Sequence, residues 1–266
     1  MMLPDSHIPA SRDVVALWHF ADSGAASAID ATCRAVCEGL AALVAAECSS
    51  FLLARRQRGD DWKPLRIVRF GREVELRTRA GDALLRKFED GLTEPGTRRI
   101  LEAAGQHRVA ARTDLYTPEE WGRSHARALK EATQLGDRLV GVCSVSRDVE
   151  VFFLFDRAMG AADFGAVDRA TIANAMPGFA RMCRWFALSH GASEGCQLLA
   201  PSERKVLFEL LGPSSEKALA SRLSFRPSYA HQLVVNVYRK MAVQSRAELS
   251  ALWLAGAQPL RRAGGW

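Results

Sequence analysis

The sequence predicts an α+β protein of two domains, in which an antiparallel sheet flanked by helices is followed by an all-α domain of four helices. Three observations predict this fold class. Apolar residues recur at helical spacing near both ends of the chain, strongly apolar extended segments lie between them, and a run of small residues over 189–195 separates two blocks. We therefore expect a first domain over 1–188, a linker over 189–198, a helical domain over 199–258 and a tail over 259–266.

The first half of the N-terminal domain combines helices with strands. An Ala-rich amphipathic pattern predicts a helix over 30–46, and a shorter helical pattern over 12–21 precedes it. Apolar and β-branched residues then predict three strands, over 48–55, 65–70 and 73–78. Phe70-Gly71-Arg72 is expected to form the turn between the second and third strands.

The second half of this domain adds helices around a final hairpin. Helices are predicted over 81–90 and 97–104, and Thr117 caps a further helix over 118–134. Two apolar strands over 139–146 and 150–155 follow, and then a long helix over 161–188, bent at Pro177. This order of elements fits an antiparallel sheet flanked by helices.

Four short helical patterns form the C-terminal domain. The first follows Pro201 and ends at Gly212-Pro213, and Ser214 or Ser215 can cap the second. A short break, Leu223-Ser224-Phe225-Arg226-Pro227, precedes a polar and basic third helix, and a fourth begins near Ser245. Two helices joined by a tight turn, the second with a polar exposed side, are typical of a helix-turn-helix that enters the DNA major groove.

The excess positive charge lies in the same segment. The chain has 36 Lys+Arg and 30 Asp+Glu, a net charge of +6. Residues 199–266 hold 10 of the basic and 4 of the acidic residues, so the 26 basic and 26 acidic residues elsewhere cancel. Because clustered Lys and Arg attract phosphate, the charge favours a nucleic-acid partner over a merely solvated basic surface.

Residues 236–246 read Asn-Val-Tyr-Arg-Lys-Met-Ala-Val-Gln-Ser-Arg, and matching residues precede them without a gap from Leu199 onward. On these residues the segment, about a fifth of the chain, resembles the DNA-binding domain of LuxR-type transcriptional regulators. The resemblance implies binding to double-stranded DNA as a homodimer. The residues expected to contact DNA are Lys217, Arg226, Ser228, Tyr229, His231, Gln232, Val235, Asn236, Arg239 and Lys240.

The third helix departs from that family where bases would be contacted. It has Tyr229-Ala230 where the family has Thr-Val, Leu233 where it has His, and Val235 where it often has a basic residue. We expect Gln232 to bind adenine, His231 to donate to guanine, and Val235 to contact a thymine methyl group. Phosphate contacts, which set position rather than sequence preference, are expected from Lys217, Arg226, Ser228, Asn236 and Lys240.

The N-terminal domain carries a second resemblance. Tyr116-Thr-Pro-Glu-Glu-Trp-Gly-Arg-Ser, followed by Gly136-Asp-Arg-Leu-Val-Gly, is similar to the middle of GAF-like domains, and the order of elements is that of GAF- and PAS-like sensor domains. That similarity implies a small-molecule effector bound between sheet and helices, or a surface for a partner. Ordinary core packing is the competing interpretation for each expected pocket residue: Phe51, Leu53, Trp62, Tyr116, Trp121, Cys143 and Phe153.

The sequence gives no support for two familiar kinds of input signal, a phosphorylated receiver domain and an acyl-homoserine lactone. A phosphorylated receiver domain needs an acidic pair, a phosphoacceptor Asp and a Lys in a fixed order, whereas Asp60-Asp61 is out of order and Lys130 falls in a predicted helix. Receptors for acyl-homoserine lactones in the resembled family use Trp-x-x-x-Tyr and Asp-Pro. Neither Trp18 nor Trp62 has a Tyr four residues later, and the sequence contains no Asp-Pro.

The sequence also lacks the common motifs of enzymes, cofactor-binding proteins and metal sites. It contains no nucleophile elbow, phosphate-binding loop, dinucleotide fingerprint, zinc-protease motif or Cys-x-x-Cys, so we expect no enzyme, no cofactor and no metal. Cys196 is expected to be exposed in the linker. The N-terminus does not resemble a signal peptide, and no apolar run approaches the ~20 residues of a membrane helix, so we expect a cytoplasmic protein without a membrane partner.

These observations predict a dimeric transcription factor in which a sensor domain controls a DNA-binding domain. The altered third helix leaves an alternative from another class, a non-DNA-binding anti-activator. In that case Tyr229, Leu233 and Val235 would dock on another protein. Salt separates the two hypotheses, because binding to phosphates weakens steeply with salt and an apolar protein interface does not.

Overall fold

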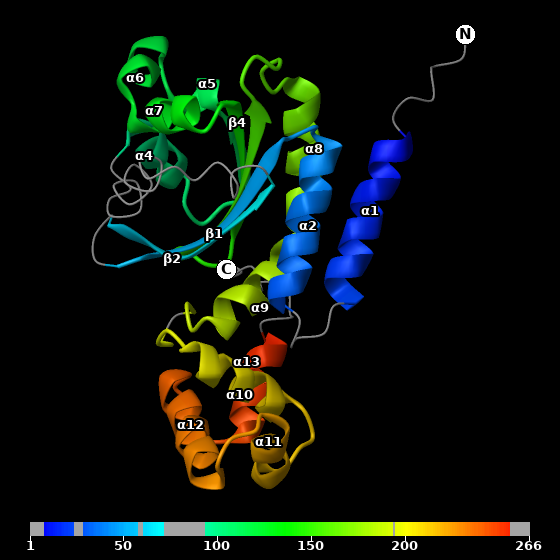
Figure 1. Cartoon of the computed structure of the whole chain (residues 1–266), viewed down its shortest axis with the longest axis vertical. Helices are drawn as coiled ribbons and strands as arrows, with labels where there is room; N and C mark the ends of the chain where they lie inside the picture. Colours follow the sequence, from blue (N-terminus) through cyan, green and yellow to red (C-terminus); the bar gives the residue numbers. More distant parts are fainter. Residues whose placement is uncertain (1–7, 24–28, 58–60, 72–93, 194, 256–266) are drawn as a thin grey trace, which may run out of the picture. The chain divides into compact units, whose positions relative to one another are not determined.

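The computed structural model describes residues 8–23, 29–57, 61–71, 94–193 and 195–255 (Figure 1). The chain divides into two compact units. The first contains α1 (Ile8–Ser23) and residues 31–180, and the second contains Ile29, Asp30 and the chain from Arg181 onward. The predicted strand over 73–78 and the predicted helix over 81–90 lie outside the described residues.

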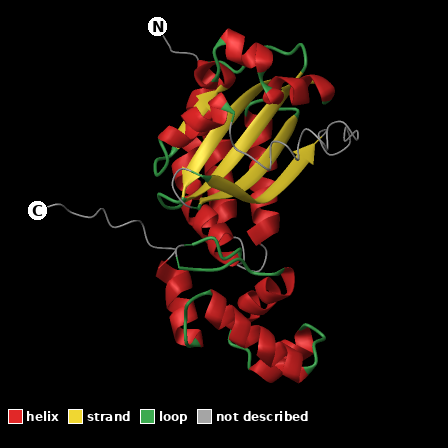
Figure 2. Cartoon of the chain, turned by 90° about the vertical axis from the view of Figure 1, so that its left-hand side faces the viewer, coloured by secondary structure: helices red, strands yellow, loops and turns green. Residues whose placement is uncertain are grey.

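The first unit is built on a five-stranded antiparallel sheet, shown as the yellow layer in Figure 2. The strands run in the order β2-β1-β5-β4-β3, so the first strand of the chain pairs with the last. The α+β class and the antiparallel sheet flanked by helices are therefore confirmed. The strands are β1 (Cys48–Arg56), β2 (Trp62–Gly71), β3 (Arg108–Ala111), β4 (Leu135–Ser144) and β5 (Val149–Ala158).

Helices cover both faces of this sheet (Figure 1). On one face lie α2 (Ile29–Leu43), α8 (Ala166–Ala175) and the short helix η3 (Met176–Phe179). Gly141 of β4 shows how closely they pack, because a Cβ at that position would lie 2.8 Å from Ile172. The other face carries four short helices: α4 (Pro95–Glu102), α5 (Arg112–Leu115), α6 (Pro118–Arg123) and α7 (His125–Ala132).

The helical insertion between β2 and β4 differs most from the sequence-based expectation. The helix predicted over 118–134 is two helices, because Ser124 adopts an extended backbone and its hydroxyl accepts from the Arg127 amide at 3.0 Å. The sequence did not predict β3 or α5, which are four residues each. The helix predicted over 161–188 is divided at Pro177 by η3, which links α8 to α9 (Ala180–Ser189).

The second unit contains four helices after α9, at the positions that the sequence predicts: α10 (Pro201–Leu211), α11 (Glu216–Arg222), α12 (Pro227–Lys240) and α13 (Arg246–Ala255). The hydroxyl of Ser215 caps α11 by accepting from the Ala218 amide at 3.3 Å. Helix α12 buries one apolar stripe against α10 and α11. In the same unit the rings of Trp185 and Trp253 are stacked, with their centroids 5.5 Å apart. The buried apolar stripe of α12 consists of Ala230, Leu233, Val234 and Val237.

The segment expected to be a linker is folded against the C-terminal end of α12. The Gln197 amide donates to the Lys240 carbonyl at 2.7 Å, and the Leu199 amide donates to the His190 carbonyl at 3.2 Å. Cys196 is buried rather than exposed, with its sulfur 3.8 Å from the Met241 carbonyl. Gly191 has a φ of +67°. Residues 190–193 and 195–199 are called here the crossing segment. Because they contact the end of α12, they are part of the helical unit.

Candidate functional site

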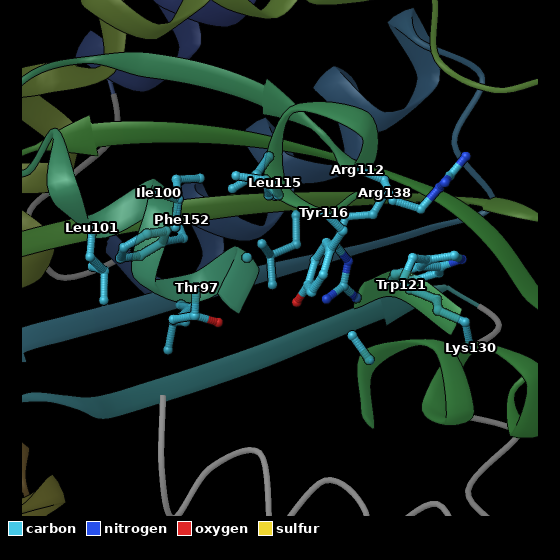
Figure 3. A pocket seen from close by; sticks show the side chains of 15 residues that line it. Thr97, Ile100, Leu101, Arg112, Leu115, Tyr116, Trp121, Lys130, Arg138 and Phe152 are labelled. Atoms are coloured by element: carbon cyan, nitrogen blue, oxygen red, sulfur yellow. The ribbon is translucent and has the colours of Figure 1, made fainter. Parts of the chain in front are cut away.

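A cavity of about 80 Å³ lies between the sheet and helices α4 to α7 (Figure 3). Strands β1, β4 and β5 form its floor, and the four short helices with the residue after α5 form its walls. All of these elements belong to the first unit. The lining residues are Leu52, Gly96, Thr97, Ile100, Leu101, Arg112, Leu115, Tyr116, Trp121, Ala126, Lys130, Arg138, Val140, Phe152 and Leu154.

The two ends of the cavity differ in chemistry. Ile100, Leu101 and Phe152 gather at one end, whereas Arg112, Lys130 and Arg138 lie toward the other, next to Trp121 (Figure 3). The site therefore presents an apolar part and a part with cationic side chains. Such a division can orient a bound molecule that has one polar end.

Buried acids hold the cationic groups in place. Both carboxylate oxygens of Asp156 accept from Arg138 at 2.7 Å, and Lys130 forms an ion pair with the same carboxylate. Burial alone would raise the pKa of Asp156, but the positive charges of Arg138 and Lys130 lower it below its ordinary value. Arg112 donates to Asp137 at 2.8 Å, and its guanidinium lies 5.3 Å from the centroid of the Trp121 ring.

Tyr116 brings a polar group to the apolar wall. Burial raises the pKa of its phenol, and the negative charge of Glu94 raises that pKa further, so the hydroxyl stays protonated and can donate. The Glu94 carboxylate also accepts from the His125 amide at 2.9 Å. Gly96 leaves room for Tyr116, because a Cβ at residue 96 would lie 2.2 Å from the ring.

The sequence-based pocket is only partly the cavity that the structure contains. Tyr116 and Trp121 line it, and their rings meet edge to face at 5.3 Å. Trp62 packs into the apolar cluster on the same face of the sheet without lining the cavity.

Four expected pocket residues require a correction, because their side chains point to the opposite face of the sheet. Phe51 and Phe153 contact each other there at 4.9 Å, and Phe153 lies 6.3 Å from Phe179. Successive residues of a strand point to opposite faces, so the cavity takes Leu52 and Phe152 from the same strands instead. The residues that face away from the cavity are Phe51, Leu53, Cys143 and Phe153.

Sequence reasoning missed the cationic end of the cavity. Arg138 and Asp156 stand opposite each other in the register of β4 and β5. Arg138 directly precedes one of the two apolar segments predicted as strands and Asp156 directly follows the other. That placement was the available signal, because paired antiparallel strands bring the start of one next to the end of the other. Arg112 and Lys130 gave no comparable signal, since each lies among other charged residues of short helices.

A second candidate site is the exposed side of α12 together with the first turn of α11 and the residue that caps α12. Tyr229 and Val235 are large side chains left 48% and 49% exposed, so they are not part of the unit's core. Tyr229 contacts Phe225 edge to face at 5.3 Å. The exposed residues among those predicted to contact DNA are Lys217, Arg226, Ser228, Tyr229, His231, Gln232, Val235 and Arg239.

Two of the residues predicted to contact DNA are partly buried. Asn236 is one, and Lys240 is the other. The Lys240 ammonium donates to the carboxylate of buried Glu203 at 2.8 Å and to the Leu198 carbonyl at 3.2 Å. Lys240 is thus tied to the crossing segment and to α10, which explains its position by packing rather than by a ligand.

Neighbouring basic residues are also held within the unit. Arg246 donates to the Leu210 carbonyl at 2.7 Å, at the C-terminal end of α10. Arg222 pairs with Glu209 at 2.6 Å. The cations left on the exposed side of this site are therefore fewer than the sequence charge suggests.

Within the described part of the chain, no helix is both long and apolar enough to cross a membrane. Over the same residues, no three His, Cys, Asp or Glu side chains are grouped so that they could hold a metal ion.

Comparison with known proteins places the chain in no family. No protein-family model matches it, and no curated protein matches it in sequence. Among the solved structures to which the chain is similar, three are described here, all at low sequence identity. SdiA in complex with octanoyl-rac-glycerol is 12% identical, with a TM-score of 0.47 over 96% of this chain and 97% of that chain. Escherichia coli SdiA in another crystal form is 12% identical, with a TM-score of 0.44 over 93% and 97%. The VqsR LBD domain from Pseudomonas aeruginosa is 11% identical, with a TM-score of 0.47 over 66% and 97%. A likeness at these values does not by itself assign a function.

Proposed function

We propose that the protein is a DNA-binding transcriptional regulator of the LuxR type, in which the first unit responds to a small molecule and the second binds double-stranded DNA. The observation that carries the proposal is the division of α12 into two sides. Its apolar stripe is buried in the helical unit, while His231, Gln232 and Arg239 are left exposed beside Arg226. A short polar helix presented in this way after a tight turn is suited to the major groove.

The location of charge supports the same proposal. The net +6 of the chain resides in residues 199–266, and Lys217, Arg226 and Arg239 are exposed around α12. In this proposal these three residues contact phosphates, whereas His231 and Gln232 contact bases. The protein would bind a site with two-fold symmetry as a homodimer, with the two α12 helices about one DNA turn apart.

The first unit is proposed to be a GAF-like sensor whose effector enters the cavity at Tyr116 and Trp121. At about 80 Å³ the cavity is smaller than the roughly 300–1,000 Å³ of typical ligand pockets. Binding therefore requires the short helices α4 to α7 to move outward. Such a movement would let the effector shift the population of binding-competent molecules.

Selection of fragments from random and genomic DNA by the purified full-length protein tests the DNA-binding half. The wild-type chain should enrich a two-fold symmetric site, and His231→Ala with Gln232→Ala should abolish the enrichment. Lys205→Ala, which removes an exposed charge on α10 outside the proposed interface, is the matched control and should enrich the same site. Protein-partner binding that is insensitive to salt, with no enrichment at low or moderate salt, would instead favour the anti-activator alternative.

Thermal unfolding in the presence of a small-molecule library tests the sensor half. A ligand that binds only the folded protein raises the unfolding temperature, and the increase grows with the logarithm of the ligand concentration divided by its Kd. Trp121→Ala should remove that increase, whereas Val167→Ala, at a position 70% exposed, should keep it. A ligand whose effect survives Trp121→Ala would bind somewhere other than this cavity.

A further inference from the structure

Helices α11 and α12 are joined by a polar contact at the surface proposed to face DNA. The Nδ1 atom of His231, in the second turn of α12, lies 3.0 Å from a carboxylate oxygen of Glu216, the first residue of α11. Both side chains remain accessible, at 67% for His231 and 49% for Glu216. The imidazole is therefore bound at its Nδ1 atom, while most of the ring remains accessible for another partner.

Glu216 is itself well placed to hold that edge. The Ser215 hydroxyl fixes the start of α11, and an acidic residue in a first helical turn is stabilised by the helix dipole. The charge of Glu216 also acts on Tyr238, whose pKa is raised by burial, lowered by Arg246 and raised by Glu216. His231 and Tyr238 are seven residues apart, two helical turns on one side of α12, so the carboxylate faces that side of the helix.

The chemistry of the contact decides which nitrogen carries the hydrogen. An ionised carboxylate can only accept, so the Nδ1 atom of His231 must donate. In a neutral imidazole only one nitrogen carries hydrogen, which leaves the outward Nε2 atom as an acceptor. A histidine held in this form cannot donate to guanine.

We infer that Glu216 determines which base His231 recognises, by fixing the tautomer in which Nε2 accepts a hydrogen bond. This inference rests on the proposed function and deepens it. In the major groove an acceptor pairs with the amino group of adenine or cytosine, whereas guanine presents only acceptors. The preference expected from the sequence alone, a histidine that donates to guanine, is thereby reversed for the neutral imidazole. Glu216 is a positioning residue, since it acts through His231.

Binding of the full-length protein to variants of its selected site provides the first test. At pH 8 one position in each half-site should prefer adenine or cytosine over guanine by roughly 5-fold, the effect of one net hydrogen bond. His231→Ala and Glu216→Ala should both remove this preference at that position alone. Lys217→Ala, next to Glu216 in the chain, is the matched control and should weaken binding to all sequences alike.

The tautomer can be measured without DNA by long-range proton–nitrogen NMR on the full-length protein at pH 8. The wild-type spectrum should show His231 protonated at Nδ1, and Glu216→Ala should convert it to a mixture. A guanine preference, or an adenine or cytosine preference that survives Glu216→Ala, overturns the inference and leaves the proposed function intact. If neither the wild-type protein nor its variants bind any DNA, the proposed function fails. The base-recognition inference then fails with it, even where NMR supports the tautomer.

Discussion

Asp156 accepts hydrogen bonds from Arg138 through both oxygens and pairs with Lys130 while completely buried. Because its pKa is lower in the folded state than in the unfolded state, its contribution to stability is full above the ordinary aspartate pKa of about 3.8. That contribution is lost as the pH falls from there through the lowered folded-state value. We therefore expect the free energy of unfolding of the first unit to decrease below about pH 4.

The variant Asp156→Asn checks this expectation by denaturant unfolding followed between pH 3 and pH 7. It should destabilise the first unit by about 3–5 kcal/mol at pH 7, because buried Lys130 and partly buried Arg138 lose their shared anion. The free energy of unfolding of this variant should also change less between pH 3 and pH 7 than that of the wild-type protein. Asp163→Asn is a matched control, since Asp163 pairs with Arg112 while 61% exposed, and should cost less than about 1 kcal/mol. Equal losses in the two variants would contradict the argument.

Gly191 and Gly195 allow a second comparison at single residues. Both have positive φ, +67° and +75°, but a Cβ at residue 191 would lie 1.6 Å from the Gln197 carbonyl oxygen, whereas residue 195 has open space. Gly195→Ala should cost about 1–2 kcal/mol, the penalty for an L-residue in this conformation. Gly191→Ala should cost more, because the crossing segment must also move. Thermal unfolding of the second unit measures the difference.

At the scale of elements, strands covered on both faces explain what the sequence could and could not predict. In β1, residues 48–54 are all buried, so apolar residues run without alternation and mark the strand clearly. The same lack of alternation conceals which side chains face which layer. That is why Phe51 and Leu53 were predicted in the pocket in place of Leu52.

Short elements were missed for another reason. Strand β3 is Arg-Val-Ala-Ala, too short and too weakly apolar to stand out, and it is positioned by its pairing with β4. The four C-terminal helices gave clear signals, because each has a proline, a serine cap or a glycine at a boundary and one apolar stripe. Within the candidate site, Tyr116 and Trp121 were predictable as large aromatic residues, but Arg112, Lys130 and Arg138 required the fold that gathers them.

Because helix α11 is short, its stability depends strongly on the residue that caps its N-terminus. It has seven residues, and Ser215 satisfies one of the amides that the helix cannot pair internally. Ser215→Ala should destabilise the second unit by about 1 kcal/mol in denaturant unfolding. Ser221→Ala, at an exposed position inside the same helix, should be neutral or slightly stabilising because alanine is the better helix former.

At the scale of the whole molecule, the net charge overstates the number of cations free to contact DNA. Lys240, Arg222 and Arg246 are engaged inside the second unit, and Lys217, Arg226 and Arg239 remain exposed near α12. In the proposed dimer, three phosphate contacts in each of two copies predict that the logarithm of the affinity falls with the logarithm of salt concentration with a slope of about −5.

Fluorescence anisotropy on the selected site, between low and moderate salt, measures that slope. Arg239→Ala should make it shallower by about 2 for a dimer, since one contact is lost per copy. Lys240→Ala should leave the slope unchanged and lower stability instead, because it leaves buried Glu203 without its cation. A shallower slope for Lys240→Ala would mean that this ammonium leaves Glu203 to contact DNA.

The crossing segment has a consequence for anyone who wishes to graft the second unit onto another protein. A junction placed at residue 199 would appear natural from the sequence, yet it would sever the bonds that Gln197 and Leu198 make with Lys240 and remove Trp185 from its stack on Trp253. A graft that starts at Arg181 would carry these contacts with it. We expect a fragment of residues 181–266 to unfold cooperatively and one of residues 199–266 to be loosely packed, as their near-ultraviolet circular dichroism would report. The modular unit inherited in a chimera would then be larger than helices α10 to α13 alone.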